Sequence, residues 1–115
     1  MGGRGRGRSG SAAPGQTIRR VILAPTALAH IRALRQHYRR LERFEASSNL
    51  TKAVREAKRR IEAGEGFPAP RPYPWLARPG DAWVHAGRYW FAYRDTAPAV
   101  IFAVFYDQAD IPGRL

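Results

Sequence analysis

Three runs rich in aromatic and β-branched residues follow one another in the second half of the chain, at residues 82–86, 88–95 and 99–106. Gly87 separates the first two runs, and the segment "DTAPA" separates the last two. Such side chains favour strands, and short runs divided by turn residues predict an antiparallel meander. The run at 99–106 is apolar on both faces, so we expect it inside the sheet, with helices covering one face and another surface covering the other.

The run "GRYWFAYRD" contains four aromatic rings within five positions, between two arginines. In an extended strand the side chains point alternately to opposite faces. One face then carries Tyr89, Phe91 and Tyr93, and the other carries Arg88, Trp90, Ala92 and Arg94. We expect the three rings to pack beneath helices and the two arginines to face the surface where a partner lies. The alternative is a platform of exposed rings that stack on RNA bases.

The segment before the meander has the periodicity of two helices joined as a hairpin. Residues 25–44 begin with proline and threonine and repeat apolar side chains at helical spacing, which predicts the first helix. The expected break is "EASSN" at 45–49, because serine and asparagine cap helices. Apolar residues recur at helical spacing from 50 to 61, and Gly64 is the expected C-cap of the second helix. A short strand at 18–24 precedes the hairpin.

These elements predict an α+β fold, in which a helical hairpin packs on one face of a small, mainly antiparallel four-stranded sheet in the order β-α-α-β-β-β. Five prolines between residues 65 and 82 make that segment a connecting loop, because proline disrupts regular helices and central strands. Residues 1–17 are rich in glycine and arginine and have almost nothing to bury, so we expect a disordered tail. Residues 18–115 are then a single domain.

The charge and the composition restrict the partners. Twenty lysines and arginines against nine acidic residues give a net charge of +11, which favours nucleic acid, an acidic protein or a membrane surface. The chain has no cysteine, which fits a reducing compartment. The longest apolar run near the N-terminus is interrupted by Pro25 and is too short to span a bilayer, so we expect a cytoplasmic protein with no membrane partner. His30 and His37 lack a third ligand at helical spacing, and we expect no metal and no cofactor.

Three motifs occur in a fixed order: "RPYPWL", then "HAGRYWFAYRD", then "AVIFAVFYDQADIP". Together with the order of the elements they resemble the RelE/ParE superfamily of bacterial type II toxins. That family has a proline-linked loop, a "vGRYrvxYr" strand and a last strand that runs into a "hgrrDip" tail. The resemblance covers residues 18 to 115, which is the whole predicted domain. It implies the fold described above and a role as the toxin of a toxin–antitoxin, or plasmid stabilization, module.

The family divides into two mechanisms. RelE-like members cut mRNA inside the ribosome with basic residues of the sheet, whereas ParE-like members act on DNA gyrase and have no accepted nuclease site. Trp90 stands where the RelE-like strand carries its phosphate-binding arginine, and no lysine follows Lys58. The segment "DQADIPGRL" also lacks the C-terminal arginine and aromatic or histidine pair of the nucleases. These departures favour the ParE-like branch, with DNA gyrase as the target and no enzymatic activity.

The side chains that remain for chemistry are His85, Arg88, Tyr93 and Arg94. With His85 as general base and Arg88 as phosphate clamp, the protein would be a ribosome-dependent mRNA endoribonuclease, which is the alternative function. A lone histidine in an aromatic sheet is more often structural, so we assign no catalytic site. A non-toxic basic nucleic-acid-binding domain is a second alternative, and it requires only the charge and the "GRGRGR" tail.

Both branches of the family are held inactive by a small acidic antitoxin, which suits a chain of this charge. We expect the C-terminal segment of the antitoxin to lie over the helical hairpin and the sheet edge, where carboxylates meet arginines of the two helices. The candidate partner-binding residues are Arg32, Arg35, Arg39, Arg55 and Arg59. The alternative without a partner is a solvated helix surface on which the charges form pairs such as Glu56 with Arg60.

Overall fold

The computed structural model describes residues 20–109 and 111–114. Along the chain, the elements are β2 (Val21–Leu23), α1 (Pro25–Arg40), α2 (Phe44–Glu62), the 3₁₀ helix η1 (Pro74–Leu76), β3 (Asp81–Ala86), β4 (Tyr89–Arg94), β5 (Ala99–Tyr106) and the short α3 (Ile111–Arg114). The fold is α+β, and the order β-α-α-β-β-β is the predicted one. The tail expected at residues 1–17 lies outside the described residues.

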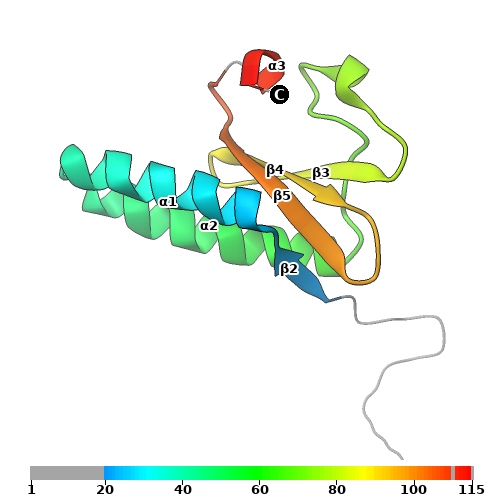
Figure 1. Ribbon diagram of the computed structural model, residues 1–115, viewed down its shortest axis with the longest axis horizontal. Helices are drawn as coiled ribbons and strands as arrows, with labels where there is room; N and C mark the ends of the chain where they lie inside the picture. The colour runs from blue at the N-terminus through cyan, green and yellow to red at the C-terminus, as the bar shows by residue number, and fades with distance from the viewer. Residues whose placement is uncertain (1–19, 110, 115) are drawn as a thin grey trace, which may run out of the picture.

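The four strands form one sheet in the order β2-β5-β4-β3. The pairs β3–β4 and β4–β5 are antiparallel, which confirms the meander, and β2 pairs with β5 in parallel. The apolar strand β5 therefore lies inside the sheet, as its sequence predicts. Figure 1 shows the helical hairpin on one side of this sheet, and η1 and α3 on the other.

Each face of the sheet has its own hydrophobic cluster. Tyr89, Phe91 and Tyr93 of β4 pack against the helices in the larger cluster, which confirms the predicted alternation. The other face carries Trp83 and Phe105, together with other apolar side chains, and is covered from η1 and α3 by Leu76 and Ile111. Because both faces are covered, β5 is apolar on both sides.

The turn of the hairpin lies earlier than predicted. α1 ends at Arg40 and α2 already begins at Phe44, so "EASSN" forms the first turns of α2 and not a break. Glu42 has a φ of 56°, and the amides of Glu42 and Arg43 donate to the carbonyls of Arg39 and Tyr38. These bonds form a Schellman motif, which ends a helix through a residue in the left-handed conformation. The polar residues suggested a cap, but a glutamate in an unfavoured conformation makes the turn.

The end of α2 is the predicted one. Gly64 has a φ of 75°, and the amides of Gly64 and Glu65 donate to the carbonyls of Ile61 and Arg60. This is a second Schellman motif, and glycine adopts the required left-handed conformation without strain. The proline-rich loop follows this motif and leads to the face of the sheet opposite the helices.

α1 also covers the part of β5 that lies beyond the short strand β2. Thr26 donates its hydroxyl to the carbonyl of Phe102 at 2.7 Å, and Nδ1 of His30 accepts from the amide of Val104 at 3.1 Å. Two side chains of a helix thus satisfy backbone groups that a strand would otherwise pair. His30 is therefore an interface histidine with a structural role.

A buried hydrogen bond between the hydroxyls of Tyr38 and Tyr89 joins α1 to β4. Burial is the main cause that raises the pKa of Tyr89 above its usual value of 10, and the hydrogen bond to Tyr38 is the second. Because the folded state resists ionisation, the stability that Tyr89 contributes is complete below about pH 10 and decreases as the pH rises further. We expect urea unfolding to show this alkaline loss, and we expect Tyr89→Phe to reduce it. An identical pH profile for both proteins would refute this role of the pair.

Candidate functional site

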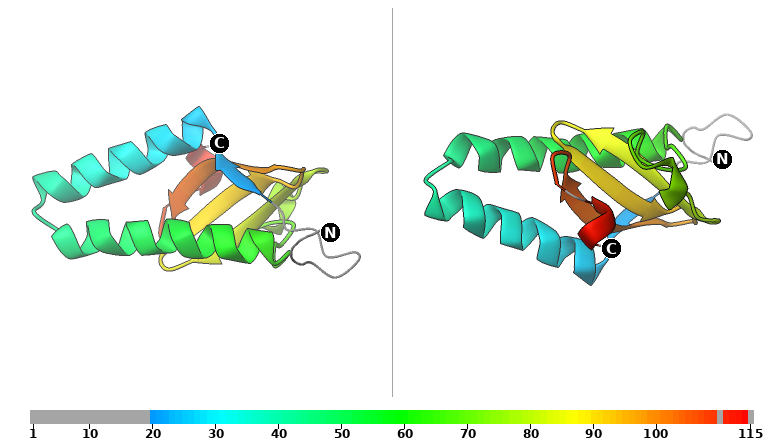
Figure 2. Two further views of the ribbon diagram at one scale, coloured as in Figure 1. Left: turned by 90° about the horizontal axis from the view of Figure 1, so that it is seen from below. Right: turned by 90° about the horizontal axis from the view of Figure 1, so that it is seen from above.

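A groove of about 1660 Å³ lies between the two helices of the hairpin and one end of the sheet. The hairpin extends past the sheet, and its helices diverge from the tip toward the strands (Figure 2). Ala33, Leu34 and Tyr38 line the groove from α1, and Tyr89 and Tyr106 line it from the sheet. The inner side of the hairpin is therefore only partly covered by the sheet, which leaves apolar and aromatic side chains at the groove.

The charges of the groove are mixed. Arg43, Lys52 and Arg88 line it together with Glu42, Glu45 and Glu56. The hydrogen bond from Arg59, and to a smaller extent the hydrogen bond from Arg60, lowers the pKa of Glu56 to about 2. This carboxylate is therefore ionised at neutral pH. The Glu56–Arg60 pair is the predicted one. A groove with both signs of charge and apolar walls suits an amphipathic protein segment better than a chain of phosphates.

The groove also borders the edge of β5 that lies beyond β2 and is covered by α1. β2 pairs with β5 only as far as Leu23 opposite Ile101, although β5 continues to Tyr106. Beyond that point the amide of Val104 donates a hydrogen bond to Nδ1 of His30. No other strand among the described residues pairs with this edge of β5. Side chains of α1 therefore take the place of a further strand along this edge.

None of the five arginines predicted to bind a partner lines the groove. Arg32, Arg39 and Arg55 are exposed on the helices. Arg35 is half-buried and donates to the carbonyl and hydroxyl of Ser47 and, at 2.8 Å, to the hydroxyl of Thr51, so it holds α1 against α2. Arg59 forms a salt bridge with Glu56 at 2.7 Å. Arg35 and Arg59 therefore have partners within the hairpin itself, whereas the other three arginines are open to solvent.

Two of the four predicted catalytic candidates, His85 and Arg88, flank the same turn at Gly87, whereas Tyr93 and Arg94 lie away from them. Tyr93 is 2% exposed beneath the helices, and Arg94 is exposed at the opposite end of β4 from Arg88. Arg88 lines the groove and donates to the hydroxyl of Tyr106 at 3.4 Å. His85 is not among the residues of the groove. Asp107 nevertheless bonds to both His85 and Arg88, because its amide donates to the carbonyl of Arg88 at 2.9 Å and its carboxylate pairs with the ring of His85.

His85 has its own partner, which sequence reasoning missed. Its Nε2 lies 3.0 Å from Oδ2 of Asp107, and its ring packs against Trp90 at a centroid distance of 4.9 Å. The other oxygen of Asp107 is buried without a hydrogen-bond partner among the described residues. A carboxylate on one ring nitrogen orients a histidine and leaves the other nitrogen available to accept a proton. His85 and Asp107 lie 22 residues apart, so only the strand register could have revealed the pair.

The residues that the structure describes contain no group of three or more histidine, cysteine or acidic side chains that could hold a metal ion. Nor does this part of the chain contain a helix of the length and apolarity that crossing a membrane requires. The features available for function are therefore a groove, a histidine–aspartate pair and exposed surfaces. Comparison of the chain with protein-family models, with curated proteins and with solved structures finds no match.

Proposed function

We propose that the protein is the toxin of a bacterial type II toxin–antitoxin module of the RelE/ParE type, and that it inhibits growth by acting on DNA gyrase. The motifs of the sequence and the order of its elements support the family. The burial of Tyr93 and the place of Arg94 at the far end of β4 support the gyrase branch, because cleavage of RNA by this fold requires several cationic and proton-transferring groups around one phosphate. The separation of Tyr93 and Arg94 from His85 and Arg88 is the observation on which the proposal rests.

A supercoiling assay with purified gyrase tests this function directly. Increasing amounts of the toxin should reduce the supercoiling of relaxed plasmid, and heat-denatured toxin should not. Gyrase that remains fully active at a large excess of folded toxin would contradict the proposed target.

We propose that the partner is a small acidic antitoxin. The net charge of +11 and the exposed Arg32, Arg39 and Arg55 favour an acidic segment over the hairpin. The apolar groove supplies surface for the same segment to bury. Salt screens the exposed charges but not the apolar contacts, so a complex of this kind should survive moderate salt.

Co-expression with the small open reading frame beside the gene tests the partner. We expect a complex that co-purifies in moderate salt and restores growth. A chain that purifies alone and remains toxic would contradict this partner.

The pairing of His85 with Asp107 favours a second candidate function, a ribosome-dependent mRNA endoribonuclease. In that case His85 would accept the proton of the attacking hydroxyl, and His85→Ala should reduce cleavage of translated mRNA by about 10²- to 10⁴-fold. The exposed His37 on α1 provides a matched control, since His37→Ala removes a histidine that lies elsewhere. Primer extension on translated mRNA measures the cuts. Cleavage that is equal in both variants, or absent from the native protein, would refute a catalytic role of His85.

A further inference from the structure

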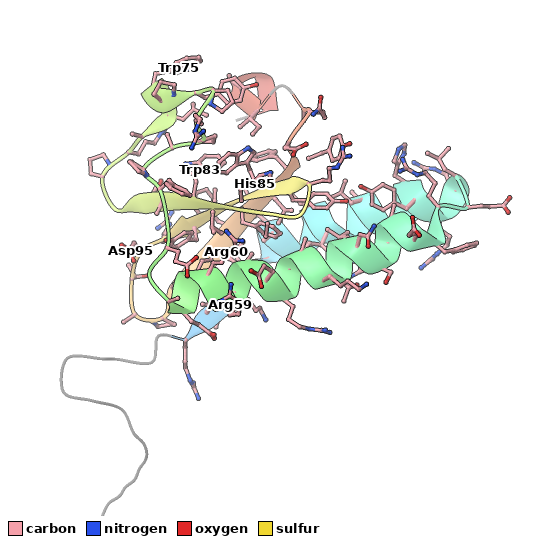
Figure 3. All side chains as sticks on the ribbon, turned by 180° about the vertical axis from the view of Figure 1, so that it is seen from behind. Arg59, Arg60, Trp75, Trp83, His85 and Asp95 are labelled. Carbon is pink, nitrogen blue, oxygen red and sulfur yellow. The ribbon has the colours of Figure 1, made fainter. Side chains whose placement is uncertain are left out.

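The proline-rich segment between α2 and β3 presents a single tryptophan to solvent. Trp75 is 68% exposed, although tryptophan is a residue that proteins usually bury for the most part. It lies in η1, on the side of the sheet away from the hairpin (Figure 3), and it does not line the groove. An exposed indole of this kind is the type of side chain that most often dominates the binding energy of a protein interface.

The segment that carries Trp75 is held in one conformation. Leu76 is 8% exposed in the cluster on this face of the sheet, and the ring of Tyr73 meets the indole edge-on at 5.6 Å. The amide of Leu76 donates to the carbonyl of Tyr73 at 3.0 Å, and Phe67 exchanges two hydrogen bonds of 2.7 Å with Trp83. The prolines restrict the backbone further. Trp75 is thus presented on a rigid support, which reduces the entropy lost on binding.

The segment on either side of Trp75 carries only positive charges. Arg71 and Arg78 are both exposed on the same segment. No acidic residue occurs between Glu65 and Asp81. The knob formed by residues 71–78 therefore combines one protruding indole with two cations and no compensating carboxylate. A complementary surface would be acidic around an apolar pocket.

We propose that this knob, residues 71–78 with Trp75 at its centre, binds the target protein of the toxin by inserting the indole into an apolar pocket with an acidic rim. This inference rests on the proposed function, and it assigns target binding to the face opposite the groove. A single-stranded nucleic acid is a poorer fit, because such ligands stack on several exposed rings along a basic track. Here Tyr73 is half-buried and lies edge-on to Trp75.

Replacement of Trp75 separates this role from the rest of the protein. Trp75→Ala should raise the toxin concentration needed for half-inhibition of gyrase by at least about 30-fold, as expected for the loss of a central interface residue. Trp75→Phe should recover part of the inhibition. Leu41, which is 53% exposed at the tip of the hairpin and outside the groove, provides the control variant Leu41→Ala. Circular dichroism should give all four proteins the same folded spectrum.

The role of charge is tested in the same assay. Arg78→Glu should weaken inhibition, whereas Arg40→Glu, which reverses an exposed arginine at the end of α1, should not. If the native toxin inhibits gyrase and Trp75→Ala inhibits it equally well, the inference is wrong and the proposed function stands.

Growth arrest on expression gives a readout that does not depend on gyrase. If purified gyrase is unaffected by the native toxin, the proposed target is wrong. In that case arrest that Trp75→Ala relieves and Leu41→Ala does not would support the knob for another target protein. The inference would be overturned if both variants still arrested growth. It would also be overturned if the native chain and both variants all failed to arrest growth. Salt-resistant binding of a single-stranded RNA oligonucleotide that Trp75→Ala abolishes would contradict a protein partner.

Discussion

Replacing Phe91 by alanine is expected to lower the free energy of unfolding by about 3–5 kcal/mol, the usual cost of such a change in a core. The Phe91 side chain is 0% exposed and lies in the cluster between β4 and the helices. Its removal would leave a cavity that the rigid sheet cannot close. For a chain whose total stability is about 5–15 kcal/mol, this loss is large enough to lower the yield of folded protein.

The chain offers a matched control in Phe44, which is 69% exposed at the start of α2. Phe44→Ala removes the same atoms without opening a cavity and should change stability by less than about 0.5 kcal/mol. Urea unfolding followed by circular dichroism measures both variants. Comparable losses at the two positions would show that the cluster beneath the hairpin is not the core described above.

Replacing Gly66 by alanine is expected to cost about 1–3 kcal/mol, because the new methyl group would overpack the core. A Cβ at this position would lie 1.9 Å from the hydroxyl oxygen of Tyr93 and 2.9 Å from its ring. Tyr93 is 2% exposed and cannot turn away. The entropic gain of about 0.4–1 kcal/mol that alanine usually brings over glycine is smaller than this steric cost.

A double-mutant cycle separates the clash from other effects of the change. In a Tyr93→Phe background the nearest clashing atom is absent, so Gly66→Ala should cost less than it does in the native chain. Thermal or urea unfolding of the four proteins gives the coupling energy. A coupling of zero would mean that Gly66 and Tyr93 are not in contact.

The strands could be predicted closely because their signal is local. The predicted runs at 82–86, 88–95 and 99–106 differ from β3, β4 and β5 by one residue at most at each end. Alternation of aromatic side chains and the turn residues between the runs decide both the boundaries and the pairing. The same alternation correctly assigned Tyr89, Phe91 and Tyr93 to the helical side.

The hairpin turn could not be predicted by the same means. Serine and asparagine suggested a cap at 45–49, but tertiary packing keeps those residues helical, and Arg35 of α1 bonds Ser47 and Thr51 from the side. The turn is instead formed at Glu42, a residue type that rarely takes a φ of 56°. Contacts between elements outweighed the local preference of the sequence.

The candidate sites depend on long-range geometry and were the least predictable part. The groove arises because the hairpin is longer than the sheet it covers, which no single segment reveals. The bond from His85 to Asp107 crosses from β3 to the residue that follows β5. The prolines around Trp75 indicated a loop correctly, but its rigidity and the exposure of the indole follow only from the packing of Leu76 and Tyr73.

Expression of the chain alone in a bacterium, with growth, the DNA damage response and mRNA decay all monitored, tests the central claim most directly. We expect growth arrest with an induced DNA damage response and without codon-positioned mRNA cuts, and we expect co-expression of the acidic partner to relieve the arrest. Normal growth at high expression would contradict a toxin of any kind. Arrest with codon-positioned cleavage of mRNA and no DNA damage response would contradict gyrase as the target.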